Sequence, residues 1–318
     1  MKERNVTSLA NVSSFFSRFL VYQKERFPLV QYIPLISIFT YSAASYSRMC
    51  RGDESIIDLG ILVTASVTAI LFFLLLRISD EFKDYEDDMK YRPYRPVPRG
   101  LVSLKELSKL GWSIIAITFL LNLYVMPSII IPYIFVLLFM YLMYNEFFVS
   151  NWLKARPLLY ATSHMLIMPV IDFYTTGVDW IQYDTFPPNG VEVFLIVSFF
   201  NGVVIEIGRK IRVPEKEEDG VETYSSLYGP NRATYFWIVA MSITMLSAVW
   251  ACSFIDFTQT GSTMLIIAFS ICIIPGILFL IKKKHRYSKL IEAVSGVWTI
   301  LMYLIVGAAP MLLKSFGV

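Results

Sequence analysis

Apolar residues are grouped in long stretches, separated by short polar segments, from residue 29 almost to the end of the chain. A helix needs roughly 17 to 25 apolar residues to cross a bilayer. Nine stretches have this length, and they are 29–47, 56–79, 110–126, 129–149, 158–176, 190–208, 232–254, 262–281 and 290–313. The pattern therefore predicts an all-α integral membrane protein with nine transmembrane helices.

The overall composition excludes an ordinary soluble protein. Of the 318 residues, 56% are hydrophobic and only 17% are charged, whereas soluble domains carry about 25% charged residues. The mean hydropathy is +0.57. The three cysteines lack the spacing of a zinc site or a disulfide framework. Nothing in the charge pattern indicates a nucleic-acid partner, and membrane lipids are the expected surroundings.

The distribution of basic residues supports the same division into spans. With the N-terminus taken as cytoplasmic, 24 of the 28 Lys and Arg residues fall on the cytoplasmic side, and the opposite side receives only Arg48, Arg51 and Lys314. Positive residues are enriched in cytoplasmic loops. We therefore expect the N-terminus and the two long polar loops, 80–109 and 209–231, to be cytoplasmic, and the C-terminus to lie on the opposite side.

Residues 1–28 precede the first predicted span and combine aromatic with basic side chains. This composition is typical of a helix that lies in the membrane interface, and a disordered tail is the alternative. No small-residue cleavage site follows the first apolar stretch, so we expect the segment to remain in the mature protein. Residues 29–318 are then expected to form a single nine-helix domain.

Three aspartates, Asp80, Asp84 and Asp88, follow the second predicted span at a spacing of four residues. On a helix, residues at this spacing are rotated by only about 40°, so the three carboxylates share one face. Like charges stacked in this way repel each other, and a small multivalent cation between them reverses the sign of the interaction. The spacing therefore indicates a metal site.

A basic, proline-rich segment comes directly after the aspartates. Pro93, Pro96 and Pro98 prevent a continuous helix, so Arg95 and Arg99 are expected on a loop beside the acidic face. An acidic helix face and a basic loop at the membrane edge together suggest a diphosphate bound through Mg²⁺.

These residues resemble the first aspartate-rich motif of the UbiA superfamily of intramembrane prenyltransferases, NxxxDxxxD followed by RPxPxG. Asp84 and Asp88 match the two aspartates, Asp80 stands where the family usually has Asn, and residues 95–100 match the trailing segment. Family members also have nine spans, with the acidic loops after the second and the sixth. The resemblance covers nearly the whole chain and implies nine helices around a central cavity.

The resemblance implies a Mg²⁺-dependent enzyme that ionises a prenyl diphosphate and transfers the prenyl group to an aromatic or other lipophilic acceptor. Asp80, Asp84 and Asp88 would bind the metal and would be the catalytic residues. For Arg77, an ion pair with Asp80 is the alternative to a substrate contact. The basic residues expected to bind the diphosphate are Arg77, Lys83, Arg95, Arg99, Arg209, Lys210 and Arg212.

The second motif departs from the family pattern. Family members usually carry DxxxD after the sixth span, followed by Gly, Thr and a later Leu-Gly. Gly220, Thr223 and residues 228–229 resemble the later positions, but counting back from Gly220 places Arg212 and Lys216 where the aspartates are expected. The acids of this segment are instead Glu206, Glu215, Glu217, Glu218 and Asp219.

Two interpretations of the second segment stay open. In one, a small shift lets Glu206, Glu215 or Glu218 hold a second Mg²⁺. In the other, the second metal site is lost and the bases within 209–212 neutralise the diphosphate directly, as guanidinium and ammonium groups can. We favour a mixture, with Glu206 and Glu215 as the candidate metal ligands and the bases on the phosphates.

Ionisable residues within the spans are costly and indicate function by default. Glu146, His164 and Asp172 belong to this group, and the last two lie eight residues apart and hence near one face of a helix. A role in binding the acceptor or taking up a proton is one interpretation. A hydrogen-bonded packing role is the more common one.

A membrane terpene cyclase of the same superfamily is the main alternative function. It would use the same ionisation, but the double bonds of the prenyl chain itself would capture the cation. The altered second motif keeps this alternative open. A transporter or channel also has many spans, but it would not need an acidic helix face joined to a basic proline loop.

Overall fold

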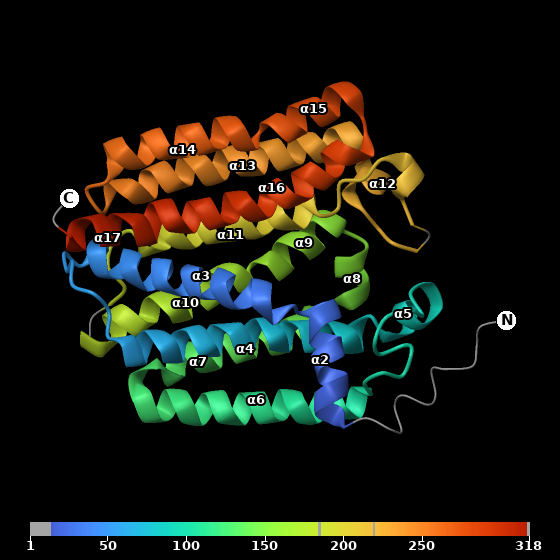
Figure 1. Ribbon diagram of the computed structural model, residues 1–318, viewed down its shortest axis with the longest axis horizontal. Coiled ribbons are helices and arrows are strands. Elements are labelled where there is room, and N and C mark those ends of the chain that lie inside the picture. The colour runs from blue at the N-terminus through green and yellow to red at the C-terminus, as the bar shows by residue number, and fades with distance from the viewer. Residues whose placement is uncertain (1–13, 184–185, 219, 317–318) are drawn as a thin grey trace.

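The computed structural model describes residues 14–183, 186–218 and 220–316, and every regular element within these ranges is helical. Most long helices run side by side, and α2 crosses them steeply at one end (Figure 1). The longer helices are α2 (Phe15–Arg26), α3 (Leu29–Cys50), α4 (Leu59–Lys83), α6 (Leu104–Val125), α7 (Ile130–Tyr144), α10 (Ile167–Trp180), α11 (Val191–Gly208), α13 (Pro230–Ser253), α14 (Thr258–Cys272) and α16 (His285–Tyr303). The shorter elements are α5 (Tyr85–Tyr91), η1 (Pro127–Ile129), η2 (Glu146–Phe148), α8 (Ser150–Lys154), α9 (Pro157–Met165), η3 (Ile181–Tyr183), η4 (Pro214–Lys216), α12 (Tyr224–Tyr228), α15 (Ile274–Lys282), η5 (Leu304–Ala308) and α17 (Ala309–Ser315).

Each of the nine predicted spans falls on one helix or on two or three consecutive helical elements. By length and hydropathy, seven helical segments of the described chain could cross a membrane, or eight if α2 and α3, which meet at a 63° bend, form one span. The predicted span 158–176 is not among them, because a break at Leu166 divides it between α9 and α10. Nine spans are therefore compatible with the structure.

Helices α3 and α11 hold the bundle together, since α3 packs against α4, α10 and η5 while α11 packs against α10, α13 and α16. The close approach of η5 to α3 depends on Gly307, where a Cβ atom would collide with the backbone carbonyl group of Ser42. Asp172 links α10 to α16, because its carboxylate accepts hydrogen bonds from Tyr303 (2.9 Å) and Thr175 (3.1 Å). These contacts satisfy Asp172 within the bundle and agree with a packing role.

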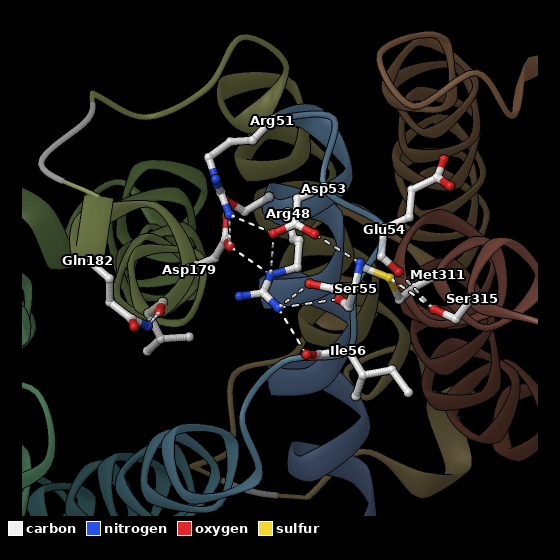
Figure 2. Close-up of polar contacts among 12 residues, drawn as sticks. Arg48, Arg51, Asp53, Glu54, Ser55, Ile56, Asp179, Gln182, Met311 and Ser315 are labelled. Atoms are coloured by element: carbon white, nitrogen blue, oxygen red, sulfur yellow. Dashed lines mark hydrogen bonds and ion pairs between the residues drawn. The ribbon is translucent and has the colours of Figure 1, made fainter.

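A cluster of charged residues ties α3 to α10 at the end of the bundle away from α2, which we call the opposite end (Figure 2). The Asp179 side chain is fully buried, and its two oxygens accept hydrogen bonds from Arg48 Nε (3.0 Å) and from Arg51 Nε and Nη2 (2.9 and 2.8 Å). Arg48 Nη1 also donates to the carbonyl oxygens of residues 55 and 56. Buried charges are tolerated when they are paired and hydrogen-bonded in this way.

Candidate functional site at the α4–α5 junction

The first aspartate-rich segment lies where α4 leaves the bundle, at the end that carries α2 and α5 (Figure 1). The uninterrupted helix expected through Asp88 is broken, because α4 ends at Lys83 and Asp84 (φ −91°, ψ 5°) separates it from α5. Backbone hydrogen bonds still run from Asp84 N to Asp80 O (2.9 Å) and from Asp88 N to Asp84 O (2.8 Å). Successive aspartates therefore stay about one turn apart despite the break.

The three aspartates differ in their surroundings. Asp80 has a half-exposed side chain, 3.5 Å from Arg77. The buried Asp88 carboxylate is neutralised by Arg92 (2.9 Å) and Arg95 (2.6 Å). Asp84 is half-buried and forms no hydrogen bond or ion pair through its side chain among the residues described. Burial, reinforced by the charges of Asp80 and Asp88, raises the pKa of Asp84, and the charges of Arg77 and Arg95 offset this rise only in part.

The proline loop is fixed by ion pairs to its surroundings. Arg95 contacts Asp88, while Arg99 donates to Glu25 of α2 (2.7 Å) and to the carbonyl oxygen of Tyr94 (2.8 Å). Gly100 has φ +76°, which residues with a side chain rarely adopt, and this turn leads the chain towards α6. The two arginines of this loop that are expected to bind the diphosphate, Arg95 and Arg99, are thus paired with carboxylates, which phosphate oxygens can replace.

Lys83, another residue expected to bind the diphosphate, is engaged elsewhere. Its ammonium group lies 2.8 Å from Glu146 Oε1, 3.2 Å from His164 Nε2 and 3.3 Å from the Tyr160 hydroxyl. Glu146, Phe147 and Phe148 all have positive φ angles of 50° to 60°, an unfavourable backbone conformation for residues other than glycine. His164 therefore meets Lys83 and Glu146 rather than Asp172.

The second polar segment begins at the end of α11. Glu206 is buried and receives Arg209 Nε (2.7 Å) and Lys210 Nζ (2.8 Å), and Arg212 pairs with Glu218 (3.0 Å). Burial lowers the pKa of Arg209, but Glu206 and, more weakly, Asp80 raise it to a larger extent. The charge of Asp80 therefore acts on Arg209, which indicates that the second segment lies on the same side of the bundle as the first.

The remaining residues of the second segment build the turn that follows it. Thr223 caps α12, and Glu217 accepts hydrogen bonds from Thr223 and Ser225, both at 2.8 Å. Glu215, a candidate metal ligand, is exposed, and no side-chain contact holds it among the described residues. Asp219 lies outside the described residues.

The residues of this site can supply two carboxylate ligands to a Mg²⁺ ion, but not a complete set of protein ligands. No three His, Cys, Asp or Glu side chains come close enough together to hold a metal in the described parts of the chain. Mg²⁺ at phosphate sites, however, is usually bound by one or two carboxylates together with phosphate oxygens. Asp84, with its unpaired carboxylate, and the neighbouring Asp80 meet this requirement. Asp88 and Glu206 are already neutralised by basic residues.

Sequence comparison decides the family. The profile of the UbiA prenyltransferase family matches residues 37–295, which contain both polar segments. The chain belongs to the UbiA prenyltransferase family. It is thus an integral membrane protein that crosses the bilayer several times, as the hydrophobic pattern predicted. Among curated protein sequences, none matches the chain.

A solved structure confirms the UbiA fold. The structure of digeranylgeranylglyceryl phosphate synthase in membranes is similar over 92% of this chain and 99% of that protein, with a TM-score of 0.63 and 16% sequence identity. At this identity the similarity establishes the fold alone. The region matched by the family profile begins at residue 37, so α2 lies outside it.

Two acidic residues of the site were not assigned from the sequence. Glu81 was one acid in an acidic stretch, yet it is buried and pairs with Arg26 of α2. Glu146 was counted only among the ionisable residues within the spans, without a partner, yet it pairs with Lys83. For Glu81 the available signal was its position three residues after the apolar Ile78, on the same helix face. For Glu146 the partner comes from a distant segment, so the sequence held no comparable signal.

Proposed function

We propose that this family member is a Mg²⁺-dependent prenyltransferase that ionises a prenyl diphosphate and transfers the prenyl group to an aromatic or other lipophilic acceptor. The observation that carries the proposal is the unpaired, half-buried carboxylate of Asp84 beside Asp80 and Asp88, at a site that also gathers basic residues. Carboxylates without a counter-cation next to anion-binding groups are suited to a metal–diphosphate complex.

Asp84 and Asp80 would hold the Mg²⁺ ion, which when bound would neutralise charge on the leaving diphosphate. Arg95, Arg209 and Lys210 would contribute by exchanging their carboxylate partners for phosphate oxygens. Such charge-assisted hydrogen bonds are strongest where negative charge builds up in the transition state.

The reaction breaks the bond between C1 of the prenyl chain and the diphosphate oxygen, and the electron pair leaves with the diphosphate. An electron pair of the acceptor then forms the new bond to C1, and the acceptor loses a proton to the diphosphate or to a base. The apolar helices would surround the prenyl chain and exclude water, which would otherwise capture the cation.

The name of the structurally similar protein supports a lipophilic acceptor, since that protein is a synthase of digeranylgeranylglyceryl phosphate. We further propose that the N-terminus and both polar segments face the cytoplasm, because most basic residues lie on that side of the predicted spans.

A terpene cyclase is the second candidate, and one observation favours it. Arg212 and Lys216 stand where the second pair of family aspartates is expected, so a different set of groups would bind the diphosphate. A site altered in this way is compatible with ionisation of the diphosphate without a separate acceptor.

Incubation of the purified chain with Mg²⁺ and a panel of prenyl diphosphates tests both candidates. Diphosphate release that requires an added aromatic or lipid acceptor supports the transferase. Release without an acceptor, accompanied by a cyclic hydrocarbon or alcohol, supports the cyclase. A folded protein that releases no diphosphate under any of these conditions contradicts both.

A further inference from the structure

Four side chains from α2 and α4, two of them buried and two partly buried, form a second polar cluster next to the aspartates. Tyr22 and Arg26 lie one turn apart on α2, and Arg77 and Glu81 lie one turn apart on α4. The Glu81 side chain is only 1% exposed, and its Oε1 atom accepts a hydrogen bond from Arg26 Nε at 2.6 Å. Arg77 Nε lies 3.5 Å from the same oxygen, without hydrogen-bond geometry.

Three polar atoms of this cluster are buried without any hydrogen-bond partner in the described chain. They are the Tyr22 hydroxyl, Arg26 Nη2 and Arg77 Nε. The Tyr22 side chain is fully buried, and the charges that act on its hydroxyl are Glu81, Arg77, Arg26 and Asp80. Buried polar groups are nearly always hydrogen-bonded, so three such atoms in one cluster indicate a missing partner.

The chemistry of these atoms defines that partner. Arg side chains have only donors, and a Tyr hydroxyl also donates, so the missing group must supply acceptors. Two guanidinium groups face one buried carboxylate, and the second acidic group, Asp80, is half-exposed and lies 3.5 Å from Arg77. Apart from Asp80, the cluster therefore holds two positive charges and one negative charge. An anionic group with several oxygens meets both requirements, and Arg is especially suited to phosphate.

We propose that Tyr22, Arg26 and Arg77 form an oxyanion site for a phosphate or diphosphate group, with α2 supplying two of the three side chains. Where that group is the diphosphate of the prenyl substrate, the inference rests on the proposed function. Helix α2 is held in place by ion pairs of Arg18 with Glu106 and of Glu25 with Arg99. Helix α2, which carries Tyr22 and Arg26, lies outside the region matched by the family profile. It is nevertheless positioned at the end of the bundle where α4 leads into α5 (Figure 1).

The substitution Tyr22→Phe gives the sharpest test, because the Tyr22 hydroxyl has no partner within the protein. Its removal should leave the melting temperature of the detergent-purified full chain unchanged or slightly higher. If the hydroxyl donates to a bound oxyanion, the same change weakens binding about tenfold, as expected for one hydrogen bond to a charged oxygen. Arg26→Gln should weaken binding more strongly than Tyr22→Phe.

Tyr46→Phe is the matched control at the opposite end. The Tyr46 hydroxyl is buried and donates to the carbonyl oxygens of Gly190 (3.1 Å) and Ala251 (3.0 Å). This variant should lower the melting temperature and leave oxyanion affinity unchanged, the reverse of the pattern for Tyr22→Phe.

Two probes identify the source of the oxyanion: an unreactive thio analogue of geranylgeranyl diphosphate with Mg²⁺, and inorganic phosphate, each titrated calorimetrically. If the site binds the substrate diphosphate, Tyr22→Phe weakens binding of the analogue, and phosphate does not bind once the analogue is saturating. If it binds a separate phosphate, inorganic phosphate still binds to protein saturated with the analogue. In that case Tyr22→Phe weakens the binding of phosphate and leaves the binding of the analogue unchanged. Both results support the oxyanion site.

Unchanged affinity for both probes in Tyr22→Phe and Arg26→Gln overturns the inference. Normal binding of the analogue in those variants would leave the proposed function intact. Conversely, wild-type protein that binds phosphate through Tyr22 but never binds the analogue would contradict the proposed function alone.

Discussion

Two clusters at opposite ends of the bundle are built from the same parts, two arginines and one buried carboxylate. At the opposite end, Arg48 and Arg51 share Asp179, and both carboxylate oxygens accept hydrogen bonds (Figure 2). At the aspartate end, Arg26 and Arg77 approach a single oxygen of Glu81. Only the second cluster leaves buried donor atoms without partners, among the residues described.

The difference separates a structural role from a binding role. The Asp179 cluster has all its hydrogen bonds within the protein, so it can link α3 to α10 without any other molecule. The Glu81 cluster and the unpaired Asp84 carboxylate lie near each other, and together they lack both an anion and a cation. A metal–diphosphate complex would supply the two at once, which is why we propose that catalysis takes place at this end.

Asp179→Ala should have the largest effect on stability. Removal of this carboxylate leaves the largely buried guanidinium groups of Arg48 and Arg51 with only the partly exposed Asp53 as a partner, which costs about 3 kcal/mol of unfolding free energy. Thermal unfolding in detergent measures the loss, and turnover per folded molecule should stay unchanged. Asp53→Ala is the control, because its partly exposed carboxylate should contribute less than about 1 kcal/mol. A fall in turnover without a loss of stability would contradict the structural role of the Asp179 cluster.

Asp84→Ala should have the largest effect on catalysis. Turnover should fall by about 10²–10³-fold, or roughly 3–4 kcal/mol, as for the loss of a group that stabilises charge in the transition state. Stability should be unchanged or slightly higher, because an unpaired half-buried carboxylate is removed. The exposed neighbour Asp87 provides the matched control, Asp87→Ala. Wild-type turnover in Asp84→Ala would exclude the metal site.

Arg212→Ala tests the second polar segment and should have a smaller effect. If the guanidinium group exchanges Glu218 for a phosphate oxygen, the KM for the prenyl diphosphate should rise about tenfold, or roughly 1.4 kcal/mol. The value of kcat should change little. Unchanged kinetics would show that Arg212 forms only its ion pair with Glu218 and does not contact the substrate.

The pH dependence of stability in the absence of Mg²⁺ should differ in sign between the two ends. The pKa of Asp84 is raised, chiefly by burial, so this residue favours the folded state at low pH and less so as the pH rises through its folded pKa. Although burial raises the pKa of Asp53, hydrogen bonds from Ser55 and the charges of Arg48 and Arg51 lower it overall. Its stabilisation is therefore present at neutral pH and is lost only as the pH falls through its lowered pKa.

Stability curves of Asp84→Asn and Asp53→Asn relative to wild type measure this contrast. The ordinary pKa of an Asp side chain is about 4. Between pH 7 and about 4, the difference in unfolding free energy from wild type should change with pH for Asp84→Asn and stay constant for Asp53→Asn. Parallel curves for the two variants would show that the two carboxylates do not differ in their surroundings.

The hydrophobic pattern was sufficient to locate the helices, because a bilayer requires apolar stretches of a fixed length. It could not show that the helix breaks at Leu166, because the apolar stretch continues through this position. The UbiA family, expected from Asp84, Asp88 and the proline loop, is confirmed by the family profile.

The pairing of charges within the site could not be predicted. Lys83 lies next to Asp84 in the sequence, yet its ammonium group contacts Glu146, which is 63 positions further along the chain. Helix α2 was expected only as an interfacial helix, and its contact with Glu81 depends on the 63° bend to α3. Such contacts depend on tertiary packing, which periodicity along one helix does not encode. The roles assigned to the site residues therefore remain predictions.

The most direct test of the account is an experimental structure of the full chain with Mg²⁺ and the unreactive thio analogue of geranylgeranyl diphosphate. The account predicts metal density between Asp84 and the diphosphate, with the diphosphate at the end of the bundle that carries α2 and α5. Diphosphate density remote from Asp84, or a metal held without it, would contradict the central claim.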